Sequence, residues 1–387
     1  MPPRMKSVKI KGYRPFRDFS APFGPLEVIV GANGSGKSSL FEFLWFLRET
    51  AYRDSVDLAM FPDPESTRRC IFHSPGPQKI SWDIEIDFFQ DYPIRYQGEL
   101  IGPVGNLRMV YESVRTVPPE GETPFLFMEI KEGKGFIQDP GSEKKEINLA
   151  GLNQLALRTV TDPMMKTLYG LREYIRGWRF YNSFSIDHDQ VRVPTVVKQE
   201  PFLRENAANL SSFLLGVIAN PPAFGELRQY LRSTIPGFRE LRVKALGEPG
   251  EVMAFWQEDG VENDLTLADL SDGIIQLMCW AVLCVQPSPP LLICIDEPDQ
   301  GVHPRTLPFL AGLFKKASDR TQILLATHSS YFLTLFDLSR IAVMRKEHGE
   351  AKFLKPKDSK ALIEILKDFG PEEIENLHIS DELEILA

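Results

Sequence analysis

A glycine-rich segment near the start of the chain has the residues and the spacing needed to hold a phosphate group. Residues 31–38 read Gly-Ala-Asn-Gly-Ser-Gly-Lys-Ser, which fits the pattern G-x-x-x-x-G-K-[ST]. Glycines let backbone N–H groups curl around phosphate oxygens, and a helix that begins there adds the positive end of its dipole. We expect Lys37 to reach the β- and γ-phosphates of a nucleotide and Ser38 to ligate Mg²⁺. The residues expected to contact the nucleotide are Asn33, Gly34, Ser35, Gly36, Lys37, Ser38 and Ser39. The alternative is a flexible glycine turn.

Two adjacent carboxylates follow an apolar run in the last third of the chain. Residues 291–295 are Leu-Leu-Ile-Cys-Ile, and Asp296 and Glu297 come directly after them. Such a run predicts a buried strand whose carboxyl end delivers both carboxylates to the ligand-binding edge of an α/β sheet. We expect Asp296 to hold Mg²⁺ through water and Glu297 to polarise an attacking water as a general base. Acidic strand ends are common, so the two carboxylates indicate a nucleotide site only in combination with the phosphate-binding segment.

Residues 270–273, Leu-Ser-Asp-Gly, open a strongly apolar stretch that reaches Val285. Ser271 is suited to cap a helix there, because its hydroxyl can accept a hydrogen bond from a backbone N–H of the first turn. A second interpretation is a phosphate-binding helix terminus. In that case Ser271 and Gly273 face a nucleotide that another subunit holds.

One histidine completes the set of residues that could take part in chemistry. His328 lies in Ala-Thr-His-Ser at residues 326–329, directly after an apolar run that predicts a strand. We expect His328 to sense a γ-phosphate and to help position the attacking water, and the alternative is a surface or capping histidine.

The hydrophobic pattern predicts the elements that position these groups. Strands are expected at 26–30, 178–184, 239–245, 252–257, 291–295, 322–326 and 341–344, and helices at 38–48, 272–285 and 307–317. Strands that alternate with helices imply a parallel sheet with right-handed crossovers. Residues 80–137 instead predict β structure, with a half-buried strand of period two and loops rich in proline and glycine. Residues 150–235 are expected to be mainly helical.

Composition narrows the class of protein. Of the 387 residues, 43% are hydrophobic and 25% are charged, which is a globular profile, and no apolar run is long enough to span a membrane. The N-terminus is polar and basic and does not read as a secretory signal. The net charge of −9 argues against a protein that coats DNA through bulk electrostatics.

Two further groups of residues have more than one interpretation. A local basic stripe is either a solvated edge strand or a contact to nucleic acid, and it consists of Lys6, Lys9, Lys11, Arg14 and Arg17. The cysteines show no metal-type spacing, and they are Cys70, Cys279, Cys284 and Cys294. The last three lie in apolar stretches that predict buried thiols, which fits a reducing cytoplasm.

In this order the four segments resemble the motifs of ABC-type ATPases. They correspond to Walker A at 31–38, the signature at 270–273, Walker B with its catalytic glutamate at 291–297, and the switch histidine at 328. The opening residues 8–16 and the run from Glu297 to Pro304 are similar to the RecF, SMC and OLD branch, including the stand-alone ATPases of bacterial phage-defence systems. The resemblance implies ATP and Mg²⁺ as cofactors. It also implies a homodimer or higher oligomer in which Walker A of one copy and Ser271 of the other clamp each ATP, with the loop after Glu297 touching the partner.

Two positions depart from the pattern of that class. The glutamine of the Q-loop has no clear counterpart, because the strand expected near Trp178 ends in serine and aspartate, and Gln90 is the alternative. Asp272 stands where transporters carry glycine, which brings a carboxylate near the expected γ-phosphate.

We therefore expect an α/β fold, namely the P-loop NTPase head of an ABC ATPase with a mixed sheet, an antiparallel β subdomain and an inserted, mostly helical lobe. Residues 1–149, with Walker A and the β subdomain, form the first part of the nucleotide-binding lobe. Residues 150–285 form the helical lobe with the signature. Residues 286–387 form the second part of the nucleotide-binding lobe, with Walker B, the D-loop, the switch histidine and a C-terminal tail.

Three functions stay open for such an ATPase. The first is control of a separate effector, such as a nuclease, in anti-phage defence. The second is DNA repair or chromosome maintenance in the manner of RecF or SMC proteins. The third, energising a membrane transporter, is disfavoured by the long separation of Gly36 from Ser271. Residues 150–270 are too short and too broken for an SMC coiled coil, and residues 345–387 are too few for a nuclease domain. We therefore expect a cytoplasmic protein whose effector is another polypeptide. Nucleic acid stays open as a partner, and no membrane is expected.

Overall fold

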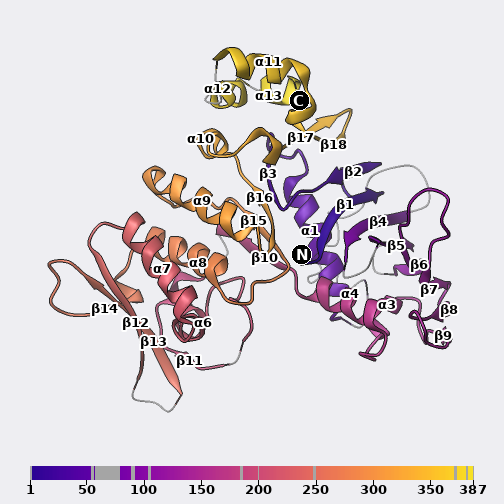
Figure 1. Ribbon diagram of the computed structural model, residues 1–387, viewed down its shortest axis with the longest axis horizontal. Coiled ribbons are helices and arrows are strands. Elements are labelled where there is room, and N and C mark those ends of the chain that lie inside the picture. The colour runs from indigo at the N-terminus through magenta and orange to yellow at the C-terminus, as the bar shows by residue number, and fades with distance from the viewer. Residues whose placement is uncertain are drawn as a thin grey trace.

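A computed structural model describes most of the chain in three sheets and the helices around them (Figure 1). The described residues are 2–53, 56, 79–88, 92–102, 106–183, 186–198, 200–246, 250–369, 373–380 and 382–386. Cys70 and Gln90, which the sequence singled out, lie outside them.

A six-stranded sheet occupies the centre of the molecule. Its strands are, in spatial order, β10 (Arg179–Asn182), β15 (Leu292–Asp296), β16 (Gln322–Ala326), β3 (Leu26–Val30), β17 (Ile341–Glu347) and β18 (Glu350–Leu354). The first five are parallel and β18 is antiparallel to β17. Crossovers include α9 (Leu307–Ala317), which connects β15 to β16 as expected. The expected mixed α/β architecture is confirmed.

Both faces of this sheet are buried, which explains why its strands read as continuous apolar runs. Side chains of a strand alternate between faces, so Val28 and Ile29 belong to different cores. One core joins the sheet to the inserted lobe, and the other joins it to the antiparallel sheet. Cys294 lies in the second core, and Cys279, Cys284 and Cys294 are buried free thiols, as predicted.

The antiparallel sheet lies to the right of the central sheet in Figure 1. Its eight strands are, in spatial order, β2 (Phe19–Pro22), β1 (Arg4–Lys11), β4 (Lys79–Asp87), β5 (Ile94–Ile101), β6 (Arg108–Thr116), β7 (Leu126–Lys131), β8 (Lys134–Ile137) and β9 (Lys145–Asn148). The helix α1 (Lys37–Thr50) packs on this sheet through Phe43 and Phe46, whose rings contact the indole of Trp82. This packing holds the first helix against a rigid support.

The basic stripe does not lie on an edge strand, so that part of the prediction is wrong. β1 pairs with both β2 and β4, and β4 brings acidic side chains beside it. The ion pairs are Lys6 with Glu85 and Asp87, Lys11 with Asp18, Arg14 with Glu42, and Arg17 with Glu350. Because four of the five cations of the stripe face a carboxylate, the stripe offers little net charge to a phosphate backbone.

The inserted lobe lies at the lower left of Figure 1 and combines helices with a small sheet. Its elements are α5 (His188–Val191), β11 (Thr195–Val196), α6 (Leu210–Ile218), α7 (Pro221–Thr234), β12 (Phe238–Ala245), β13 (Glu251–Glu258), β14 (Leu265–Thr266) and α8 (Asp272–Val285). Two preceding helices, α3 (Ala156–Thr159) and α4 (Lys166–Arg176), pack instead in the core of the antiparallel sheet. The expected boundary at residue 150 stays a proposal, and these contacts favour a lobe that begins after β10.

Short helices at the end of the chain cover the top of the molecule in Figure 1. They are α11 (Lys360–Phe369), α12 (Glu373–Ile379) and α13 (Glu382–Leu386). α12 packs against α10 (Ser330–Thr334), the helix that begins just after His328. None of the helices in the described part of the chain combines the length and apolar character that crossing a bilayer requires.

A buried glutamate connects the antiparallel sheet to α3. Glu112 is 2% exposed, and its carboxylate accepts hydrogen bonds from the backbone N–H groups of Ala156 (2.5 Å) and Leu157 (3.0 Å) and from the Tyr96 hydroxyl (3.1 Å). Burial raises the pKa of Glu112 to about 7 from its ordinary value of 4.5, and the three hydrogen bonds offset only part of that effect.

This pKa shift makes the stability of the fold depend on pH. The folded state holds the Glu112 proton more tightly than the unfolded chain does, so its contribution is full below about pH 4.5 and is lost as the pH rises through about 7. From about pH 5 to pH 8, we expect the free energy of unfolding to fall by about 2–3 kcal/mol more in the unsubstituted protein than in Glu112→Gln. Urea unfolding at both pH values measures this difference, and parallel pH profiles would contradict the assignment.

Candidate functional site

The segment 31–36 forms a tight loop between β3 and α1. Gly31 and Gly36 have φ of 147° and 115°, a backbone conformation that side chains other than glycine rarely adopt. A Cβ on Gly31 would lie 1.9 Å from the Met344 carbonyl oxygen of β17. The glycines are therefore required both by the turn and by the close approach of the neighbouring strand.

Lys37 is held inside this loop. Lys37 is the first residue of α1 and is only 5% exposed. Its Nζ donates hydrogen bonds to the carbonyl oxygens of Gly31 (2.6 Å) and Ala32 (3.4 Å). The ammonium thus lies where the loop and the N-terminus of a 14-residue helix converge. That arrangement concentrates positive potential at one point, which suits an anionic group.

Ser38 and Asp296 face each other across the base of α1. The Ser38 hydroxyl donates a hydrogen bond to Asp296 Oδ2 at 3.3 Å, and burial raises the pKa of Asp296. Both line a cavity of about 330 Å³ together with Phe41, Glu42, Trp45, Phe180, Tyr181, Asn182 and Glu205. A hydroxyl and a carboxylate are hard oxygen ligands, and a buried carboxylate gains from a cation, so the pair fits Mg²⁺.

Asn182 is a site residue that the sequence did not reveal. It ends β10 and pairs in register with Asp296 of β15, which places its amide in the same cavity as Ser38. The sequence predicted a strand near the position of the Q-loop, but the residues considered there for the Q-loop glutamine were the serine and aspartate that follow Asn182. Parallel pairing with β15 identifies Asn182 as the polar side chain nearest to Asp296 along that strand.

Glu297 has a constrained backbone and a carboxylate that is only partly bonded. Its φ of 54° is unusual for a residue with a side chain, and its N–H donates to the Ala326 carbonyl oxygen at 2.8 Å. The Ser183 hydroxyl donates to the Glu297 carbonyl oxygen. Among the described residues, Oε2 is buried without a hydrogen-bond partner. Burial, Asp299 and Asp296 together raise the pKa of Glu297 to about 7, which suits a group that exchanges protons near neutral pH.

His328 lies beside this glutamate at the end of β16. Its Nε2 is 3.5 Å from Glu297 Oε1. Burial lowers the pKa of His328, and the charges of Lys37 and of His378 on α12 lower it further. The structure therefore brings together Lys37, Glu297 and His328, as the sequence predicted. The charge of His378 on α12 also acts on His328, an influence for which the sequence contains no signal.

The loop after Glu297 contacts both the end of β16 and the helix α8. Asp299 accepts a hydrogen bond from the Thr327 hydroxyl at 2.6 Å, which ties the loop to the strand end that carries His328. Trp280 of α8 donates from Nε1 to the Pro298 carbonyl oxygen at 3.0 Å. A Cβ on Gly273 would lie 2.6 Å from the Gly301 carbonyl oxygen. The N-terminal part of α8 and this loop thus form one continuous surface.

Ser271 caps α8, as the simpler interpretation predicted. Its hydroxyl accepts a hydrogen bond from the Ile274 N–H at 3.4 Å. Within the described residues, no hydrogen bond connects Ser271 or Gly273 to the loop 31–36 of the same chain. The structure therefore gathers Lys37, Ser38, Asp296, Glu297 and His328, while Gly273 at the start of α8 lies against Gly301 of the loop after Glu297.

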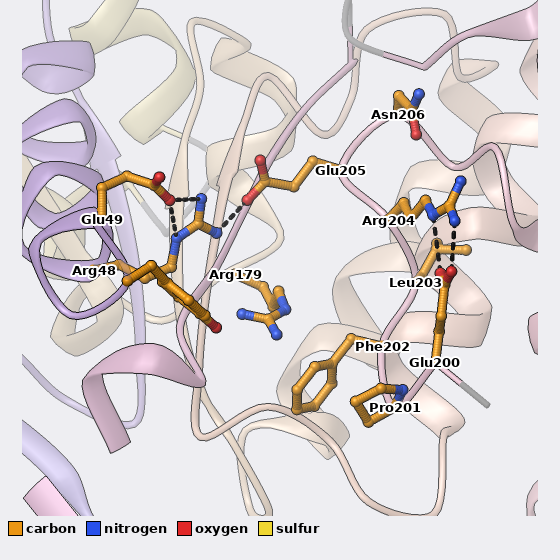
Figure 2. A pocket seen from close by; sticks show the side chains of 11 residues that line it. Arg48, Glu49, Arg179, Glu200, Pro201, Phe202, Leu203, Arg204, Glu205 and Asn206 are labelled. Carbon is orange, nitrogen blue, oxygen red and sulfur yellow. Dashed lines mark hydrogen bonds and ion pairs between the residues drawn. The ribbon is translucent and has the colours of Figure 1, made fainter. Parts of the chain in front are cut away.

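A larger cleft of about 700 Å³ lies at the far end of α1 (Figure 2). Its charges are largely paired internally, since Arg48 binds Glu49 and Glu205 and Arg204 binds Glu200 through two hydrogen bonds. Glu205 lines both this cleft and the smaller cavity. Ser38 of the smaller cavity directly follows Lys37 and the loop 31–36, so that cavity is the better candidate for a nucleotide.

Two family models match the chain. Residues 4–154 match one described as "AAA ATPase domain", and residues 151–334 match one described as "AAA domain, putative AbiEii toxin, Type IV TA system". No protein of curated function matches the sequence.

Several solved structures share the fold. An Smc head bound to the C-winged helix domain of ScpA has a TM-score of 0.57 at 14% identity, over 90% of this chain and 97% of that one. An Smc head with an extended coiled coil from Pyrococcus furiosus, bound to the C-terminal domain of ScpA, has a TM-score of 0.54 at 14% identity, over 95% and 99% of the two chains. An Smc head with a coiled coil and joint from Pyrococcus yayanosii has a TM-score of 0.51 at 11% identity, over 95% and 99%. At these identities the likeness is one of fold.

The close contact at Gly273 gives a prediction about stability. Gly273→Ala should lower the free energy of unfolding by about 1–3 kcal/mol, because the new methyl group would overlap the backbone carbonyl of Gly301. Gly312→Ala is the matched control, since a Cβ there meets nothing within 4 Å and alanine favours the helix by up to about 1 kcal/mol. Urea unfolding compares the two, and a Gly273→Ala protein as stable as the control would show that α8 does not depend on this contact.

Proposed function

We propose that this chain, which belongs to the ABC-type P-loop ATPases of the RecF- and SMC-like branch, binds and hydrolyses ATP with Mg²⁺ between two copies of itself. One observation carries the proposal. The loop around Lys37, the Ser38–Asp296 pair and the Glu297–His328 pair converge from the ends of the adjacent strands β3, β15 and β16. The carboxyl edge of a parallel sheet is where such folds bind nucleotides.

Each group in the site has a role that its position supports. The N–H groups of the loop and the Lys37 ammonium bind the phosphates, while Ser38, Asp296 and Asn182 supply oxygen ligands on the side where Mg²⁺ is expected. Bound Mg²⁺ offsets negative charge on the phosphate oxygens. Glu297 accepts a proton from the attacking water through its unpartnered Oε2, and His328 orients that water and the γ-phosphate.

A second copy is needed because the signature lies apart from the chain's own phosphate loop. Ser271 caps α8 beside the loop after Glu297, on a surface that a partner's ATP can approach. Two copies in head-to-tail arrangement would place Ser271 and Gly273 of each against the ATP of the other. Such an interface has C2 symmetry, and ATP forms part of it.

We further propose that the ATP-bound dimer, in the cytoplasm, controls a separate effector in anti-phage defence. The description of the model that matches residues 151–334 supports this, since it refers to a toxin of a toxin–antitoxin system. A role in DNA repair or chromosome maintenance is the alternative, favoured by the likeness to Smc heads. Where a coiled coil would leave such a head, the described part of this chain has a lobe whose longest helices have 14 residues, which favours a stand-alone ATPase.

Glu297→Gln tests the catalytic assignment. The amide cannot accept the proton from water, so hydrolysis should slow by roughly 10²- to 10⁴-fold while ATP still binds and the closed dimer accumulates. Turnover assays and sedimentation with ATP measure both effects, with the exposed Glu146→Gln as the matched control. A normal hydrolysis rate in Glu297→Gln would exclude Glu297 as the base.

The same variant serves as bait for the effector. Glu297→Gln should retain, in the presence of ATP, a partner that Lys37→Ala, which lacks the phosphate-binding ammonium, does not retain. A co-purifying toxin or nuclease would support the defence role. Repair or replication factors would favour the alternative, and a membrane permease would overturn both.

A mixing experiment tests whether Ser271 acts on the partner's ATP. As a cap alone, Ser271→Arg should cost about 1 kcal/mol of stability and keep its activity. At the dimer interface, the arginine should block closure, so that the variant binds ATP but neither dimerises nor hydrolyses it. When Ser271→Arg is mixed with Lys37→Ala, one of the two composite sites of a mixed dimer has both an intact phosphate loop and an intact signature. Partial recovery of ATPase activity on mixing is the expected result, and full activity of Ser271→Arg alone would refute the head-to-tail arrangement.

A further inference from the structure

Asp272 poses an electrostatic problem for the proposed dimer. It is the first residue of α8, between Ser271 and Gly273, and its side chain is 64% exposed. If the partner's ATP approaches this helix terminus, a carboxylate will stand close to several phosphate charges. Like charges that lie close together repel strongly where water is excluded, so an unpaired Asp272 would oppose closure of the dimer around ATP.

Two basic side chains from another element meet this carboxylate. Arg192, which directly follows α5, donates from Nη2 to Asp272 Oδ1 and to the Leu270 carbonyl oxygen at 3.2 Å. His188 of α5 places Nδ1 3.2 Å from the same Oδ1. Arg192 thus holds both the carboxylate and the backbone that leads into Ser271.

The burial of these groups shows that the arrangement is built into the lobe. The side chains of Arg192 and His188 are only 24% and 27% exposed, so both are mostly buried beside the more exposed Asp272. The hydrogen bond from Arg192 lowers the pKa of Asp272, which therefore keeps its negative charge. A charge that persists must be balanced rather than removed by protonation.

We propose that Arg192 is a positioning residue for the ATPase reaction, which neutralises Asp272 and turns it aside so that the Ser271 end of α8 can face the partner's triphosphate. This inference rests on the proposed ATP-bound dimer. It differs from a purely structural role in a measurable way. Because the Asp272 side chain is 64% exposed, its ion pair with Arg192 contributes little to folding, so Arg192→Ala should hardly change stability and should act on dimer closure instead.

The experiment uses the Glu297→Gln protein, in which the ATP-bound dimer accumulates, and measures its dissociation constant by sedimentation. Arg192→Ala should weaken ATP-dependent dimerisation roughly tenfold or more, because Asp272 is left unbalanced. Adding Asp272→Asn to Arg192→Ala should restore it, and Arg192→Lys should retain most of it. The defect of Arg192→Ala should also shrink as salt screens the repulsion.

Three controls separate the outcomes. Arg239→Ala removes an exposed ion pair with Asp259 in the same lobe and should leave dimerisation unchanged. ATP binding by monomeric Arg192→Ala, together with an unchanged thermal midpoint, shows that the variant is folded.

Normal dimerisation of Arg192→Ala, or a double variant as weak as Arg192→Ala, would overturn the role of Arg192 while leaving the dimer intact. Failure of the Glu297→Gln parent to dimerise at all would overturn the proposed function and this inference together.

Discussion

The parallel pairing of β15, β16 and β3 is the constraint on which the site depends. Asp296 pairs in register with Ala326, and Ala326 with Ile29, so the three strands end at one level. The ladder continues beyond the strands, since the Glu297 N–H donates to the Ala326 carbonyl and the Thr327 N–H to the Ile29 carbonyl. A slip of one residue would exchange the two buried faces of a strand, which neither core would tolerate. The burial that stabilises the sheet therefore also fixes where the loops of the candidate site meet.

That edge of the sheet concentrates negative charge before any nucleotide binds. Burial raises the pKa values of Asp296, Glu297 and Asp299, which shows that the surroundings disfavour their charged forms. Lys37 is the cation that opposes Asp296 and Glu297 most directly, yet it is also the group expected to meet the phosphates. A triphosphate would add several negative charges to this region. A divalent cation at Ser38 and Asp296 would therefore offset negative charge of the protein as well as of the ligand.

The sequence predicts those features that depend on local pattern. The bounds of β3, β16, α8 and α9 follow from apolar runs and helical spacing, and the phosphate loop follows from glycines next to a lysine. Features set by distant pairing escape prediction. Arg192 meets Asp272 across 80 positions, Asn182 gains its place only through β15, and His378 reaches the site through packing of α12 on α10. The basic stripe was wrongly expected on an edge strand for the same reason, because β1 gains a neighbour on each side only when β2 and β4 pair with it.

The start of α8, which we propose faces a partner, is not independent of the chain's own candidate catalytic residues. Trp280 of α8 is bonded to Pro298, and Gly273 touches Gly301, so the signature helix rests directly on the loop that begins at Glu297. That loop starts from a left-handed backbone at Glu297, a conformation that costs on the order of 1 kcal/mol and persists only where its surroundings hold it. The hydrogen bonds to Ala326 and from Ser183 supply that restraint. A rotation of α8 must therefore either carry the Glu297 loop along or break the contacts of α8 with Pro298 and Gly301. In the proposed dimer, closure around one ATP would in this way be coupled, through direct packing, to the geometry around Glu297 at the other.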